Sequence, residues 1–255
     1  MDQFIRSLAR QAGTVVLKYF GAAKVQYAKA NAADVVTQAD VASNRLIVAA
    51  IRRQYPRHGI ISEEQDEVAG DAEYVWIIDP LDGTRNFATR TPLFGVMIGV
   101  AHRGVMELAA IADPCQARLY FARRGRGAFC NGRRIHCATT RAWAYSYGCM
   151  GVHMQANKLP SLRRLINSSA RAPFWVNAFG SAAVNAIYVA DGRRDWYWSH
   201  SAGGVWDYAA PSLLLQEAGC IVTDVSGQPW GLTATSLVAA PPGLHAKLLR
   251  LVGPR

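Results

Sequence analysis

Two aspartates three positions apart, Asp79 and Asp82, follow an apolar run and have the types and spacing best suited to chemistry. Pro80 lies between them, and Gly83 and Thr84 follow directly. The residue before a proline is held extended, so Asp79 is predicted to end a strand. A β-turn that begins there brings the two aspartate backbones within about 7 Å. Two carboxylates this close repel each other unless a cation or a proton lies between them, so the pair predicts a divalent-metal site.

The residues after this pair are suited to holding an anion. Gly83 permits a close approach to the backbone, and the N–H groups from Thr84 onward can bind an anion at the start of a helix. A carboxylate pair beside such a backbone is suited to a metal ion that binds a phosphate group.

Further acids stand at the ends of predicted strands or on predicted helices. Glu63 and Glu64 follow an apolar pair, Asp40 lies on a predicted helix, and Asp207 is expected to be the N-cap of another. Singly, each acid has an ordinary explanation as a turn, loop, cap or surface residue. Together they stand where side chains converge in α/β proteins. The donors are all oxygens without a histidine cluster, which favours one or more Mg²⁺ or Mn²⁺ ions over zinc or copper.

Other phosphatase chemistries do not fit this sequence. No cysteine is followed six positions later by arginine, as a cysteine phosphatase requires. Asp79 and Asp82 are three positions apart, whereas an aspartyl-phosphate enzyme has two aspartates two apart. There is also no Gly-Lys-Ser or Gly-Lys-Thr phosphate-binding loop.

Composition and charge limit the classes of protein to which this chain can belong. The 255 residues are 51% hydrophobic and 18% charged, which predicts one or two globular domains and argues against disorder. No apolar run approaches the roughly 20 residues that span a bilayer, so no membrane association is expected. Five scattered cysteines without a CxxC pair indicate reduced thiols and a cytoplasmic protein. The net charge of +10 attracts anions. Paired arginines without a long basic run favour a solvated surface over a dedicated nucleic-acid site.

Periodicity and turn signals predict a mixed α/β chain. A soft boundary near residues 138–144 predicts an N-terminal α+β domain over 1–140, which carries most of the acids, and a C-terminal α/β domain over 141–255, which closes the site. The predicted helices cover 2–20, 38–54, 159–166, 181–191, 207–218 and a last helix around 244–251. The predicted strands cover 60–61, 74–78, 95–101, 107–111, 119–122, 174–176, 221–225 and 237–240, with a hairpin at 130–132.

Four segments in order resemble the inositol monophosphatase family of metal-dependent, lithium-sensitive phosphatases. DPLDGTRNF at 79–87 resembles the first signature of this family, and WDYAAPSLLLQEAG at 206–219 resembles the second. The segments 62–64 and 36–40 resemble its acidic pair and its N-terminal aspartate segment, and 180–183 its substrate-side loop. The resemblance implies a five-layer α-β-α-β-α sandwich of the sugar-phosphatase type, usually in a homodimer.

The resemblance also implies roles for matching residues around two or three Mg²⁺ ions. The Leu81 carbonyl, Glu63 and Asp79 would hold one ion, Asp79, Asp82 and Asp207 a second, and Glu63 would serve a third, water-rich site. Thr84 and Asp40 would orient the attacking water or take its proton. Other residues implied are Glu64 and Lys29 just outside the ligands, Gly83 and Thr84 on phosphate oxygens, and Gly180, Ser181 and Ala182 on the substrate side.

Two departures from the family pattern concern the substrate end. Ser199 takes the place of the glutamate with which inositol-handling members bind sugar hydroxyls, and Cys220 follows Gly219 where the signature has a second glycine. The expected reaction is Mg²⁺-dependent hydrolysis of a small phosphomonoester. An inositol phosphate, histidinol phosphate, a nucleotide 3′-phosphate and a sugar bisphosphate such as fructose bisphosphate all stay open. An alternative of another class is a family member that binds RNA or a protein partner through its basic surface.

Overall fold

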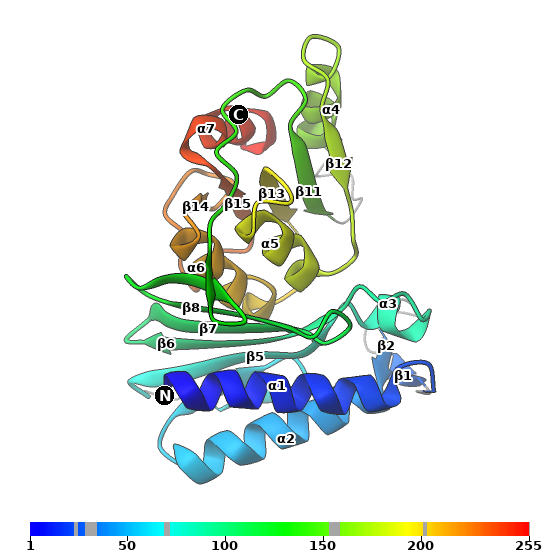
Figure 1. The fold of residues 1–255 in the computed structure, drawn as a ribbon, viewed down its shortest axis with the longest axis vertical. Coiled ribbons are helices and arrows are strands. Elements are labelled where there is room, and N and C mark those ends of the chain that lie inside the picture. The colour runs from blue at the N-terminus through cyan, green and yellow to red at the C-terminus, as the bar shows by residue number, and fades with distance from the viewer. Residues whose placement is uncertain (23–24, 29–34, 69–71, 153–158, 201–202, 255) are drawn as a thin grey trace.

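The computed structural model in Figure 1 describes residues 1–22, 25–28, 35–68, 72–152, 159–200 and 203–254. Lys29, which the family resemblance placed near the metal ligands, lies outside the described residues. Two large sheets and six longer helices are stacked in alternating layers. No helix in the described ranges combines the length and apolarity needed to cross a membrane.

The first sheet has eight strands, all antiparallel to their neighbours except for the parallel pair β3 and β5. Their order is β10-β9-β8-β7-β6-β5-β3-β4. The bounds are β3 Gly59–Ser62, β4 Gln65–Val68, β5 Tyr74–Asp82, β6 Gly95–His102, β7 Val105–Asp113, β8 Arg118–Arg123, β9 Gly127–Cys130 and β10 Arg133–Ile135.

Both faces of this sheet are buried, so its central strands are apolar at consecutive positions. On β5, Trp76 and Ile78 face the outer helices, whereas Ile77 faces the helices of the middle layer. The outer helices are α1 (Asp2–Tyr19) and α2 (Gln38–Gln54), which lie side by side across the sheet (Figure 1). A two-stranded sheet, β1 (Val25–Ala28) and β2 (Val35–Thr37), precedes α2.

The second sheet has five strands in the order β12-β11-β13-β15-β14. Two helices, α5 (Ala182–Ala190) and α6 (Ala209–Glu217), fill the space between the two sheets, and α4 (Leu159–Ser168) and α7 (Pro242–Val252) cover the outer face of the second (Figure 1). This arrangement confirms the predicted five-layer α-β-α-β-α sandwich. The strand bounds are β11 Tyr147–Val152, β12 Trp175–Asn177, β13 Trp196–His200, β14 Ile221–Thr223 and β15 Leu237–Ala240.

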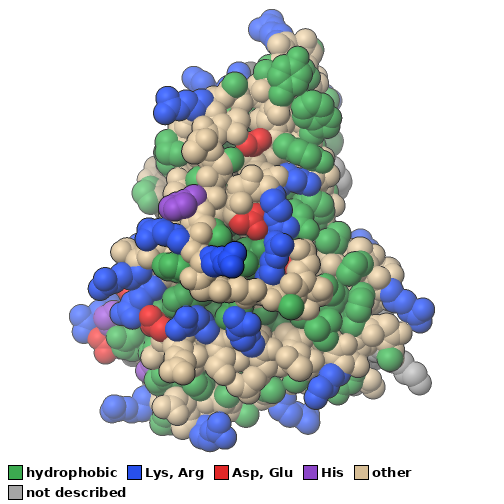
Figure 2. All heavy atoms as spheres, in the orientation of Figure 1, with side chains coloured by type: hydrophobic (Ala, Val, Ile, Leu, Met, Phe, Trp, Pro, Cys, Tyr) green, Lys and Arg blue, Asp and Glu red, His purple; other side chains and the backbone are tan. Residues whose placement is uncertain are grey.

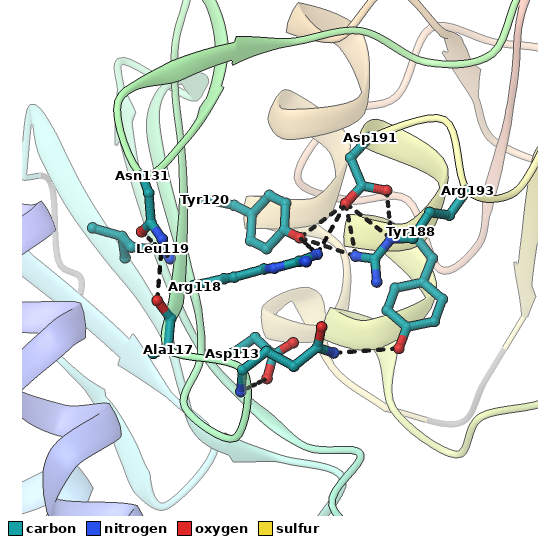
Figure 3. A network of polar contacts seen from close by, with 10 residues as sticks. Asp113, Ala117, Arg118, Leu119, Tyr120, Asn131, Tyr188, Asp191 and Arg193 are labelled. Atoms are coloured by element: carbon teal, nitrogen blue, oxygen red, sulfur yellow. Dashed lines mark hydrogen bonds and ion pairs between the residues drawn. The ribbon is translucent and has the colours of Figure 1, made fainter.

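A polar network joins the two halves of the chain where β8 meets the end of α5 (Figure 3). The Tyr120 hydroxyl on β8 donates to Asp191 Oδ2 at 2.9 Å, and Arg193 donates from Nη2 to the same oxygen at 2.7 Å and to Tyr120 Oη at 3.0 Å. The chain crosses from the first sheet to the second between Ile135 and Tyr147, a segment that includes the boundary predicted at 138–144. Because α5 and α6 pack against both sheets, the division into 1–140 and 141–255 stays a prediction.

Two sequence-based predictions about β5 and α6 are wrong. Strand β5 does not end at Asp79 but continues to Asp82, with an extra residue bulged out between the pairs Asp79–Met97 and Asp82–Gly95. Helix α6 begins at Ala209, so Asp207 is not its N-cap but ends a 3₁₀ turn, η2 (Val205–Asp207). In both places the backbone does not adopt the turn or the helix cap that local preferences predict. It instead directs an aspartate toward the other acids that the sequence singled out.

Candidate metal centre

Three aspartates from distant parts of the chain meet between the two sheets. Asp79 and Asp82 lie on β5, Asp207 lies on η2, and one carboxylate oxygen of each falls within 4.8 Å of the others. Asp79 and Asp82 are buried and Asp207 is half-buried. The structure therefore brings together the three acids that the sequence singled out from both halves.

The electrostatics of Asp79 are those of a cation site. Burial raises the pKa of its carboxyl well above the ordinary value, and the nearby carboxylates of Glu63, Asp82, Asp207 and Asp40 raise it further. A carboxylate in such a place is costly unless a positive ion or a proton compensates it. An all-oxygen donor set of this kind fits Mg²⁺ or Mn²⁺.

The bulge in β5 orients the backbone around Asp79. The Leu81 amide donates to Asp79 Oδ1 at 3.1 Å, which fixes the carboxylate, and the Leu81 side chain is buried in the outer core. The Leu81 carbonyl accepts a hydrogen bond from Thr84 Oγ1 at 2.9 Å. The Ser43 hydroxyl of α2 donates to the Pro80 carbonyl at 2.8 Å, which anchors the bulge to the outer helix.

Asp82 is held by the start of α5. Its carboxylate accepts hydrogen bonds from the Ser181 hydroxyl, from the Ala182 amide at 3.0 Å and from the Ala183 amide at 2.9 Å. Burial raises the pKa of Asp82, and these three hydrogen bonds act against that rise. The Ser181 oxygen also accepts from the Val184 amide at 3.1 Å, so it caps α5 while it binds Asp82.

Asp40 and Thr84 form a second polar pair beside the aspartates. Thr84 Oγ1 lies 3.1 Å from Asp40 Oδ1, while Asp40 Oδ2 accepts from the Thr37 amide at 2.8 Å and the Thr37 hydroxyl at 2.5 Å. This capping box at the start of α2 fixes the carboxylate, as expected for such a motif. Burial raises the pKa of Asp40 to about 6, against the effect of its hydrogen bonds.

Glu63 and Glu64 follow β3 at the edge of the first sheet where β5 also ends. The Glu63 amide donates to the Ile78 carbonyl at 3.2 Å, which places it next to the end of β5. The charge of Glu63 acts on Asp79 and that of Glu64 acts on Asp40. Glu63 therefore lies near Asp79 of the cluster, and Glu64 lies near Asp40.

Gly83 and Thr84 begin a short helix, α3 (Thr84–Ala88). Gly83 has φ +83°, a left-handed conformation that favours glycine, and a Cβ there would lie 2.9 Å from the Leu93 carbonyl oxygen. The Asn86 amide group in this helix donates to Leu93 O at 2.7 Å and to Phe179 O at 2.6 Å. The loop that follows Asp82 is thus tied to the segment that leads into α5.

A cavity of about 240 Å³ adjoins the aspartates on the side of the second sheet. Asp82, Asp207 and Ser199 are among its lining residues, and the Ser199 hydroxyl donates to Gly151 O at 3.0 Å. Its lining also includes Gly180, Ser181, Ala182, Met150, Gly151, Ala178, Asn185 and Tyr197. The predicted substrate-side residues Gly180, Ser181, Ala182 and Ser199 therefore line one cavity, although Ser181 and Ala182 already bind Asp82. Gly83 and Thr84, predicted to hold phosphate oxygens, are not among its lining residues.

Comparison with known proteins identifies the family. The model of the inositol monophosphatase family matches residues 1–254. The chain belongs to this family. It is 34% identical to Nus factor SuhB of Pseudomonas aeruginosa, with 96% of this chain and 93% of that protein covered, and 36% identical to inositol monophosphatase 2 of Rattus norvegicus, with 91% and 82% covered. The crystal structure of extragenic suppressor protein suhB from Bartonella henselae superposes with a TM-score of 0.90 at 31% identity, over 98% of this chain and 97% of that one.

Sequence reasoning missed several residues that support the candidate metal centre. Ser43 and Asn44 lie one turn after Asp40 on the buried face of α2, and Asn44 Oδ1 accepts from the Ser62 hydroxyl at 2.8 Å. Polar residues at helical spacing from Asp40 on an otherwise apolar face were a signal that could have found them. Asn185 and Tyr197 on the cavity wall gave no such signal, because they sit within apolar or aromatic runs.

Proposed function

We propose that this chain is a divalent-metal-dependent phosphomonoesterase that hydrolyses a small phosphorylated metabolite. The observation that carries the proposal is the cluster of Asp79, Asp82 and Asp207, whose carboxylate oxygens lie within 4.8 Å of one another at the edge of a cavity. Family membership adds support, since the matched model spans both halves of the chain.

The metal site proposed here uses the residues expected from the sequence. Asp79, Asp82 and Asp207, with Glu63 and the Leu81 carbonyl, would hold two or three Mg²⁺ ions, or Mn²⁺ in their place. When bound, such ions lower the pKa of water and neutralise charge on a phosphate ester. A protein of the same fold, at 20% identity, is described as an IMPase/NADP phosphatase complexed with Mg²⁺ and phosphate, which makes Mg²⁺ the first ion to test.

The protein groups around this site have separate tasks in the proposed reaction. Asp40 accepts from the Thr84 hydroxyl, and this pair would orient the attacking water and take up its proton. The Gly83 and Thr84 amides would receive phosphate oxygens. Ser199 and the loop 180–182 would face the alcohol portion of the substrate in the cavity.

The site residues indicate only the chemical class of the substrate, a small phosphomonoester. Ser199 offers a hydroxyl where a glutamate would offer a charged acceptor for sugar hydroxyls, so binding of an inositol ring would lose a strong hydrogen-bond partner. Inositol phosphate, histidinol phosphate, nucleotide 3′-phosphates and fructose bisphosphate therefore all belong in the substrate panel.

A phosphate-release screen over this panel tests the proposal, with and without Mg²⁺ and with added Li⁺. Wild type should release phosphate only with the metal, and Asp79→Asn should remove most activity. Asp113→Asn is the matched control, because Asp113 is a buried aspartate with a raised pKa on β7 outside the cluster. Equal turnover by wild type and Asp79→Asn would refute the assignment of the metal site.

A second candidate function is binding of nucleic acid or of a protein partner in transcription. Several relatives carry the name Nus factor SuhB, and this chain has a net charge of +10. Figure 2 shows Lys and Arg side chains spread over much of the visible face, without one continuous basic groove. RNA binding that weakens steeply with salt and persists in Asp79→Asn would support this second function.

We also expect a homodimer, as the family resemblance implies, which sedimentation would test.

A further inference from the structure

Five cysteines lie in the described part of the chain, and all five are free thiols. Cys137 and Cys220 differ from the other three because each thiol shifts the pKa of the other. Cys137 follows β10 in the segment that leads to the second sheet, and Cys220 lies between α6 and β14. The proposed hydrolytic reaction uses neither residue.

The backbone holds these two cysteines together. The Cys137 amide donates to the Ala218 carbonyl at 2.8 Å, and Cys137 Sγ lies 3.5 Å from the position that a Cβ would take on Gly219. Gly219 has φ +102° and allows the chain to turn at the end of α6, which brings Cys220 back beside Cys137.

The two members of this pair have different surroundings. Cys137 is half-buried and follows the exposed His136, whereas Cys220 is only 7% exposed. The neighbouring thiol of Cys220 lowers the pKa of Cys137, whereas the Cys137 thiol and burial raise the pKa of Cys220. Burial instead raises the pKa of Cys115 to about 11 and that of Cys149 to about 12. Reactive thiols are accessible and have a lowered pKa, which describes Cys137 among the five.

We propose that Cys137 and Cys220 are a redox modification site, at which a peroxide oxidises Cys137 and Cys220 then closes a disulfide. In the first step the Cys137 sulfur bonds to one peroxide oxygen, the O–O bond breaks, and the other oxygen leaves as water with the thiol proton. The sulfenic acid formed is then attacked by the Cys220 sulfur. The S–O bond breaks and the hydroxide takes the Cys220 proton, so two thiols and one hydrogen peroxide give one disulfide and two waters.

The disulfide would tie the connection between the two sheets to the end of α6. Helix α6 begins two residues after Asp207 and packs against both sheets, so its position matters for both halves of the chain. The proposal does not rest on the phosphatase assignment, because the reacting groups lie outside the aspartate cluster.

Peptide mapping of the full chain after oxidation tests the proposal. The reduced protein is treated with equimolar hydrogen peroxide, free thiols are alkylated, and the digest is analysed by mass spectrometry. We expect a peptide that links Cys137 to Cys220, with Cys115, Cys130 and Cys149 alkylated. Cys137 should react at least about tenfold faster than Cys115. Reduction with dithiothreitol should separate the linked peptides.

Cysteine variants identify which thiol is oxidised first and which thiol then closes the disulfide. In Cys220→Ala the sulfenic acid at Cys137 should persist and be trapped by dimedone, whereas in Cys137→Ser the remaining thiols should stay reduced. Cys115→Ser is the control and should form the disulfide as wild type does, and circular dichroism verifies that each variant is folded. Full alkylation of both cysteines after peroxide treatment of wild type, or a linked peptide that pairs Cys137 with a different cysteine, would overturn the proposal.

Discussion

The carboxylate of Asp82 on β5 and the hydroxyl of Ser181 at the start of α5 share a hydrogen bond across the boundary between the two halves of the chain. The amides of Ala182 and Ala183 donate to the same carboxylate. The second half of the chain therefore supplies one acid of the cluster, Asp207, and also fixes an acid that the first half supplies.

Replacement of Ser181 by alanine should weaken metal binding. The change removes a donor to Asp82 and the cap of α5, and loss of such outer contacts costs about 10- to 100-fold in metal affinity. The lost cap should also lower the free energy of unfolding by about 1 kcal/mol. Calorimetric titration with Mn²⁺ and chemical denaturation measure the two effects. Ser181→Thr keeps the hydroxyl and is the control. Wild-type values for both quantities in Ser181→Ala would show that this contact has no role.

Gly203 should be needed for the position of Asp207. A Cβ at Gly203 would lie 1.6 Å from Asp207 Oδ2, so Gly203→Ala must displace the carboxylate or the turn that carries it. We expect Mg²⁺ affinity to fall by at least about tenfold, as for other changes that disturb the supports of ligands. Gly231→Ala is the matched control, because a Cβ there meets nothing within 4 Å. If both variants bind Mg²⁺ equally well, Asp207 has no fixed place in the metal site.

The metal-free protein should become less stable as pH rises from about 4 to 6. Burial raises the pKa of Asp40 from 3.8 to about 6, so in this window the folded chain binds more protons than the unfolded chain. The free energy of unfolding then falls with rising pH. Denaturation in EDTA across this range should show a smaller decline for Asp40→Asn than for wild type. Equal slopes would show that Asp40 ionises normally in the folded chain.

The link between proton binding and stability also predicts how the stabilisation of the folded protein by Mg²⁺ depends on pH. Asp79, like Asp40, has a raised pKa, and a carboxyl must lose its proton to bind Mg²⁺. The rise in melting temperature caused by a fixed Mg²⁺ concentration should therefore be larger at pH 7.5 than at pH 5, which differential scanning fluorimetry measures. Asp79→Asn should show little rise at either pH. A Mg²⁺ effect independent of pH would contradict the raised pKa values.

Local patterns were enough to predict the outer helices and the central strands of the first sheet. α1 and α2 have apolar residues at helical spacing, and β6 and β7 are apolar runs separated by a glycine-containing turn. Glu63, Glu64, Asp79 and Asp82 were visible because they follow apolar segments. Their convergence could be expected from the fold class, although its geometry could not.

The second sheet was harder to predict because tertiary contacts decide its strands. β11 contains Gly148 and Gly151, which disfavour a strand locally. Gly148 is nevertheless required there, because a Cβ would lie 2.0 Å from the Trp196 ring on the neighbouring strand. β13 was not predicted as a strand. Its aromatic residues alternate between two cores, with Trp196 and Trp198 facing α4 and α7 and Tyr197 facing the middle layer.

Short edge strands and the backbone conformation at Asp207 also lay beyond local sequence patterns. β1, β2 and β4 have no apolar run that marks them, and they form through pairing with neighbours. An aspartate just before a helix resembles an N-cap, yet Asp207 faces Asp79 and Asp82 instead. The family resemblance, and not the local pattern, predicted that Asp207 would join these two carboxylates from the other half of the chain.

The most direct test of the account is a calorimetric Mg²⁺ titration of wild type, Asp207→Asn and Asp113→Asn. Asp207 is remote in sequence from Asp79 and Asp82, so its loss tests whether both halves build one site. We predict that wild type and Asp113→Asn bind Mg²⁺ alike and that Asp207→Asn binds at least about tenfold more weakly. Mg²⁺ binding by Asp207→Asn with the stoichiometry and affinity of wild type would contradict a metal centre shared by the two halves.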